Sequence, residues 1–88
     1  MPRVPIISRF FGIIVTMNYR EHGPPHFHAW YSGHEVTVRI EDGSVTGEMP
    51  KRALGLIMEW MQAHRDELAD NWNRAEARLP LVGIAPLE

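Results

Sequence analysis

The chain has 88 residues, of which 44% are hydrophobic and 23% charged, an ordinary globular mixture that argues against disorder and fits a single domain over residues 1–88. Its formal net charge of −2 excludes a strongly basic protein that coats DNA. It contains no cysteine, which excludes a disulfide scaffold, a thiolate zinc site and a cysteine nucleophile.

The first residues predict no targeting segment. They lack the apolar core and the small-residue cleavage site of a signal peptide, and prolines at positions 2 and 5 favour an extended arm over residues 1–9. The longest apolar runs in the chain are far too short to cross a bilayer. We therefore expect a soluble, cytoplasmic protein with no membrane association.

The middle of the chain, residues 12–48, has the pattern of an antiparallel β-meander. Alternating apolar side chains separated by turn signals predict three to four strands. These strands are expected over residues 12–19, 26–31, 34–40 and about 45–48. The pair Ser32-Gly33 predicts a two-residue hairpin turn between the second and third of them.

A helix is expected next, beginning at Pro50, where a missing N–H group costs nothing, and running to residue 78. Its apolar residues recur at spacings of three and four, and Pro80 ends it. Residues 79–88 would form an extended tail. The predicted fold class is therefore α+β, with a three- to four-stranded antiparallel meander packed on one long C-terminal helix.

The concentrated chemistry of the sequence is the string His-Gly-Pro-Pro-His-Phe-His over residues 22–28. His26 and His28 alternate with Phe27 along a predicted strand, so both should project from one sheet face while the helix covers the other. His22 precedes two prolines that stiffen the loop, and it is a candidate third member. Two neighbouring imidazoles suit acid–base catalysis, and we expect His26, His28 and His22 to act in that way.

The same histidines also suit a metal ion. We expect no cofactor, and the alternative is a divalent metal held by His22, His26 and His28. If the cluster chelates, at least three side chains of a wider set should converge on one point. That set is Glu21, His22, His26, His28, His34 and Glu35. Surface histidines without a function are the third interpretation.

Cationic and aromatic residues complete the candidate site. Lys51 and Arg52, in the first turn of the helix, together with Arg39 and Arg20 are candidate contacts for RNA phosphate or for a protein partner. Counting strand directions places Lys51 and Arg52 at the sheet end opposite His22, so we treat them as a separate, auxiliary contact. Trp30 shares the face of the two strand histidines and is a candidate for stacking on a base.

Several segments carry a family resemblance. They are residues 5–14, 22–29, 43–49, 50–54, 59–60, 64–68 and 71–72. Through them the chain resembles, from Pro5 to Leu87, a small bacterial family catalogued as domain of unknown function 4160. The string Pro-Pro-His-x-His-Ala is the most specific element, and Glu21 supplies the acidic residue that the family carries before His22.

The resemblance implies a role in a toxin–antitoxin-type pair, because the genes of similar proteins are found beside the gene of a second small protein. The leading hypothesis is a toxin-like, RNA-directed component, either a ribonuclease or an RNA-binding inhibitor, that a cognate small antitoxin-like protein neutralises. The alternatives are a non-catalytic metal-binding or protein-interaction module, and the neutralising partner of such a pair. Association of two or more copies into a homo-oligomer is compatible with each of these. The resemblance carries over no catalytic residue.

Overall fold

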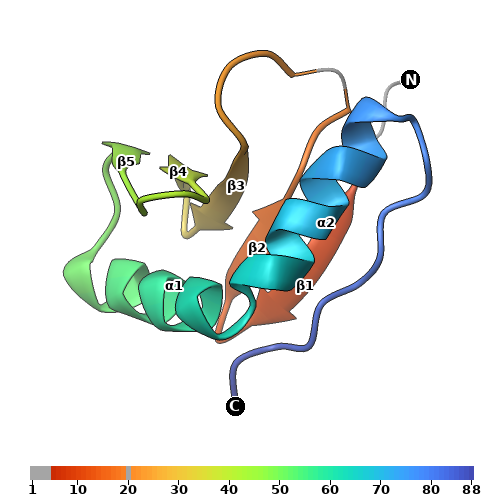
Figure 1. The fold of residues 1–88 in the computed structure, drawn as a ribbon. Helices are drawn as coiled ribbons and strands as arrows, with labels where there is room; N and C mark the ends of the chain where they lie inside the picture. Colours follow the sequence, from red (N-terminus) through yellow and green to blue (C-terminus); the bar gives the residue numbers. More distant parts are fainter. Residues whose placement is uncertain (1–4, 20) are drawn as a thin grey trace.

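The computed structural model describes residues 5–19 and 21–88, and within these it is an α+β fold. Five strands form one antiparallel sheet in the order β1-β2-β3-β4-β5, and two helices follow (Figure 1). Their bounds are β1 Ile6–Phe10, β2 Ile13–Thr16, β3 His26–Tyr31, β4 His34–Arg39, β5 Val45–Gly47, α1 Lys51–Ala63 and α2 Arg65–Glu76. The predicted meander is confirmed, since each strand pairs with its neighbour in sequence.

Two tight hairpin turns set the register of the sheet. Phe11-Gly12 joins β1 to β2, and Ser32-Gly33 joins β3 to β4 as predicted. All four residues have positive φ angles, between 48° and 81°. Such a turn matches the right-handed twist of the flanking strands, and glycine at its second position adopts the angle without strain.

One face of the sheet packs against the helices. The core side chains of β2, β3 and β4 alternate along each strand as the sequence predicts. They are Ile13, Val15, Phe27, Ala29, Val36 and Val38, each at most 1% exposed. On the helix side, the indole of Trp60 in α1 meets the ring of Phe27 edge-on at 5.7 Å between centroids. His28 and Trp30 therefore project from the opposite face.

Two details of the expected fold are wrong. The first is the number of strands, because the expected extended arm forms, in its described part, most of the strand β1, which pairs with β2 and brings the sheet to five strands rather than three or four. The single helix over residues 50–78 is two helices, because His64 leaves the helical conformation with φ −128° and ψ 26°. In Figure 1 α1 and α2 run in clearly different directions. Neither is long and apolar enough to span a membrane, and no other helix is present in the described part of the chain.

Candidate metal centre

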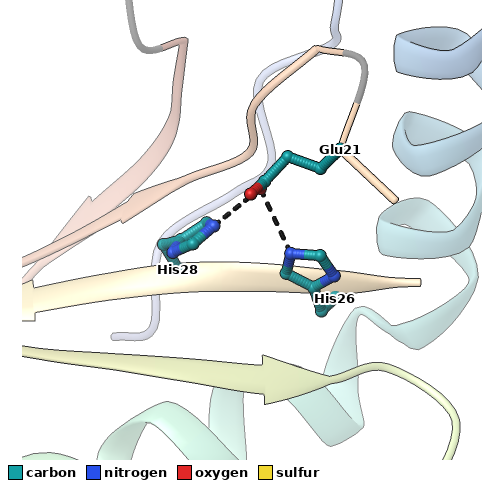
Figure 2. Close-up of side chains that lie close together, drawn as sticks. All are labelled: Glu21, His26 and His28. Carbon is teal, nitrogen blue, oxygen red and sulfur yellow. Dashed lines mark hydrogen bonds and ion pairs between the residues drawn. The ribbon is translucent and has the colours of Figure 1, made fainter. Parts of the chain in front are cut away.

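The loop between β2 and β3 brings a carboxylate back over the sheet. It leaves the core at Met17, which is fully buried, and re-enters at Pro25, whose carbonyl accepts a hydrogen bond from the Ile40 N–H at 3.0 Å. Within the loop Gly23 has φ +94°, and two prolines follow it. With both ends anchored and its turn stiffened, the loop places Glu21 above the first residues of β3 (Figure 2).

Glu21, His26 and His28, which we call the Glu–His–His triad, meet at one carboxylate oxygen. Glu21 Oε1 lies 2.7 Å from His28 Nε2 and 3.1 Å from His26 Nε2. One ligand atom from each residue lies within 4.8 Å of those of the other two. The imidazoles are only 11% and 14% exposed, and the carboxylate is 30% exposed. Three of the six side chains in the wider sequence-based set therefore converge.

The other ring nitrogen of each histidine already has an acceptor. His26 Nδ1 lies 2.9 Å from the carbonyl oxygen of Pro24, and His28 Nδ1 lies 3.1 Å from Glu35 Oε2 and 3.5 Å from Thr37 Oγ1. Both nitrogens of each ring therefore face an oxygen acceptor, and a neutral imidazole donates to one of the two. Metal-binding histidines are held in the same way, by an outer carbonyl or carboxylate on the nitrogen that does not touch the metal.

When both rings carry their proton on Nδ1, three electron-pair donors face one another. With its proton on Nδ1, a neutral imidazole presents a lone pair at Nε2, so His26, His28 and Glu21 Oε1 all point acceptors at a common region. In the other tautomers, with the proton on Nε2, the two neutral rings, whose centroids lie 5.3 Å apart, donate to the carboxylate. In the Nδ1–H tautomers one divalent cation satisfies all three donors.

The carboxylate is poised to stay ionised. Burial raises the pKa of Glu21, but the hydrogen bond and charge of His28, followed by those of His26, outweigh burial and hold the pKa below its ordinary value of 4.5. Metal ligands of this type must be deprotonated to bind. Glu21 therefore meets that condition over the neutral pH range.

Two other expected site residues, His22 and Arg39, contribute no atom to the triad. His22 is exposed and contributes no atom to the triad, so the metal set expected from the sequence is altered in one place, with Glu21 standing where His22 was expected. Arg39 is the cross-strand partner of His26, and its guanidinium lies 3.7–3.8 Å from the carboxylates of Asp42 and Glu41. Arg20 lies outside the described residues.

The basic pair lies at the other end of the sheet. Lys51 and Arg52 are exposed in the first turn of α1. Arg52 lines a surface hollow of about 330 Å³ together with Phe11 and Tyr31. Tyr31 is the last residue of β3, whereas His26 is the first, so about 17 Å of strand separates the hollow from the triad. The site and the basic pair are two separate features, as the strand count indicated.

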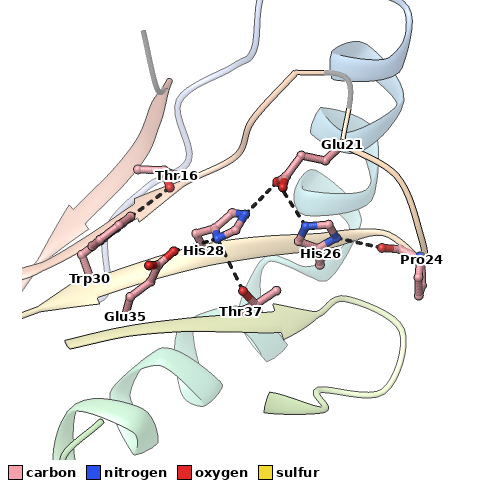
Figure 3. Close-up of polar contacts among 8 residues, drawn as sticks. All are labelled: Thr16, Glu21, Pro24, His26, His28, Trp30, Glu35 and Thr37. Atoms are coloured by element: carbon pink, nitrogen blue, oxygen red, sulfur yellow. Dashed lines mark hydrogen bonds and ion pairs between the residues drawn. The ribbon is translucent and has the colours of Figure 1, made fainter. Parts of the chain in front are cut away.

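Trp30 lies beside the triad on the same face. Its side chain is 41% exposed, and its Nε1–H donates to Thr16 Oγ1 at 3.3 Å. Thr16 pairs with His28 across β2 and β3, so this hydrogen bond draws the indole toward the triad (Figure 3).

Sequence comparison adds a family but no activity. The family model described as "Domain of unknown function (DUF4160)" matches residues 12–73, which include the whole triad and most of both helices. No curated protein and no solved structure matches the chain.

Proposed function

We propose that this chain, which belongs to the family of domain of unknown function 4160, is a divalent-metal-binding domain whose centre is the Glu–His–His triad. The observation that carries the proposal is that the two nitrogens of each imidazole ring have different partners. Nδ1 is held by Pro24 or Glu35, while Nε2 faces Glu21 Oε1. A set of two imidazoles and one carboxylate suits Zn²⁺, and it also suits Fe²⁺ and Mn²⁺.

The number of ligands indicates the kind of site. Structural zinc sites are closed by four protein ligands, whereas catalytic sites use three and keep a position for water or substrate. The triad offers three. A metal held there by Glu21, His26 and His28 would lower the pKa of a water at the open position and would supply a nucleophile at neutral pH. The reaction class we propose is hydrolysis of a phosphodiester, in which water adds at phosphorus and one P–O ester bond breaks to give a phosphomonoester and an alcohol.

The direct test is metal binding by a chain purified without a histidine tag, stripped with a chelator and titrated with Zn²⁺. We expect one ion per chain. Glu21→Gln and His28→Ala should weaken binding by more than about 100-fold, and Glu35→Gln, which removes charge from an outer acceptor, by about 10- to 100-fold. His22→Ala and His34→Ala are matched controls, because both remove an exposed imidazole that lies outside the triad.

Two results would refute this function. One is the absence of stoichiometric metal by elemental analysis after titration. The other is an equal loss of affinity in His22→Ala and in Glu21→Gln, which would mean that zinc binds to surface imidazoles rather than to the triad.

A second candidate is metal-free acid–base cleavage of RNA, and the 2.7 Å contact between His28 Nε2 and Glu21 Oε1 favours it, since a carboxylate orients an imidazole for proton transfer. Cleavage that persists in excess chelator would identify this mechanism. With either mechanism we propose the toxin-like role that the family resemblance implies, together with a neutralising antitoxin-like partner. Inducible expression in a bacterial host should arrest growth for the wild type and spare it for the His26→Ala/His28→Ala variant.

A further inference from the structure

Trp30 differs from the other tryptophans of the chain. It is 41% exposed, whereas Trp60 and Trp72 are 0% and 5% exposed and belong to the core. An exposed indole in a small domain is usually mobile, but this one is tied to Thr16 Oγ1 by its own N–H. The ring is therefore a preorganised flat surface. Its N–H group is already hydrogen-bonded, and part of its apolar area is exposed to solvent.

The position of this surface relative to the triad is fixed by the register of the sheet. Trp30 and His28 are two residues apart on β3, which places them about 6–7 Å apart on one face. The partner of the indole, Thr16, is itself opposite His28 on β2. Figure 3 shows Trp30 and the triad on the same side of the sheet. A single ligand of modest size can therefore touch the indole and the metal centre together.

We infer that this face binds single-stranded nucleic acid, with one nucleobase stacked on Trp30 and the adjoining phosphate at the metal of the triad, an inference that rests on the proposed function. Every nucleobase offers a flat π-face, and stacking on an aromatic side chain needs no sequence preference. A phosphate oxygen is a suitable ligand for the remaining coordination position. In a duplex the base faces are already stacked, so an indole on a sheet surface reaches only unpaired bases.

Tryptophan fluorescence reads this contact directly. The zinc-loaded chain is titrated with a short oligouridylate, with the matching DNA strand and with an RNA duplex of the same length. We expect the two single strands, or the RNA strand alone, to quench the exposed Trp30. Because the ring of Trp72 lies 5.1 Å from the ring of His26, the Trp30 signal is taken as the difference between the wild type and Trp30→Ala. Trp30→Ala should weaken binding, followed by anisotropy of a labelled strand, about 5- to 150-fold, and Trp30→Phe should retain most of it.

The controls separate this inference from the proposed function. Phe11→Ala removes an aromatic ring that is 60% exposed at the β1–β2 turn, and it should leave oligonucleotide binding unchanged. Zinc uptake is measured on every variant, and Trp30→Ala should still bind one ion. Failure to bind zinc overturns the proposed function. Zinc binding without quenching, equal affinity of Trp30→Ala and wild type, or tighter binding of the duplex overturns the inference alone.

Discussion

At the scale of single residues, the triad depends on which side chain of the β2–β3 loop points toward the sheet. Glu21 and His22 are neighbours, yet only Glu21 reaches the histidines of β3. In a strand, alternation predicts which side chains share a face, but a loop with a positive-φ glycine and two prolines has no such period. This is why the sequence identified His26 and His28 as a pair but favoured His22 as the third member.

The ionisation of Glu21 gives a prediction for the metal-free chain. Carboxyl-carbon NMR should show the Glu21 pKa below 4.5, and His28→Ala should raise it, because burial then acts with less opposition. Since the folded-state pKa lies below the value of the unfolded chain, ionised Glu21 stabilises the fold above pH 4.5, and this contribution is lost as the pH falls through the folded-state pKa. His22→Ala is the control, and an unchanged pKa in His28→Ala would contradict the assigned cause.

At the scale of elements, the strands β2 to β5 were predictable because their signals are local. Alternating apolar residues and the Ser32-Gly33 turn place β3 and β4 correctly. The strand β1 lies mostly within the segment for which the prolines at positions 2 and 5 predict only an extended arm. What makes residues Ile6–Phe10 a strand is their pairing with β2 through the Phe11-Gly12 hairpin, which is a contact between segments.

The apolar periodicity of the sequence does not reveal the break between α1 and α2. The buried positions Ile57, Trp60, Leu68 and Trp72 keep spacings compatible with one continuous helix, although His64 interrupts it. A local signal for a new helix was present. Acidic residues stand in the first turn of α2, where they favour a helix N-terminus, and Glu67 Oε1 also lies 2.6 Å from His64 Nδ1.

At the scale of the whole molecule, the C-terminal tail over residues 79–88 joins the helices to the sheet. The Ile84 N–H donates to the Ile7 carbonyl at 2.8 Å, and the Ile84 carbonyl accepts from Ser8 Oγ at 3.0 Å, so the tail occupies the outer edge of β1. From α1, Trp60 Nε1–H donates to the Ala85 carbonyl at 2.9 Å. The tail thus covers one edge of the sheet, which would otherwise expose unpaired backbone groups.

Asn71 of α2 provides the strongest single link between the tail and the helices. Its side chain is 1% exposed; Nδ2–H donates to the Val82 carbonyl and Oδ1 accepts from the Val82 N–H, both at 2.8 Å. We expect Asn71→Ala to lower the free energy of unfolding by about 1–3 kcal/mol, because the buried amide and both of its hydrogen bonds to the Val82 backbone are lost. Chemical denaturation measures this change.

The matched control for this prediction is Asn73→Ala, which removes the same amide from the exposed side of the same helix. It should change the free energy of unfolding by no more than about 0.5 kcal/mol. No hydrogen bond among the described residues joins the triad to Asn71 or to the tail, although His26 packs at 5.1 Å between ring centroids on Trp72, which follows Asn71 in α2. Below the unfolding transition, where Trp72 stays in place, we expect the same zinc affinity in both variants and in the wild type. Equal stabilities of the two variants would show that the tail is held by its apolar contacts, chiefly the buried Ile84, rather than by Asn71.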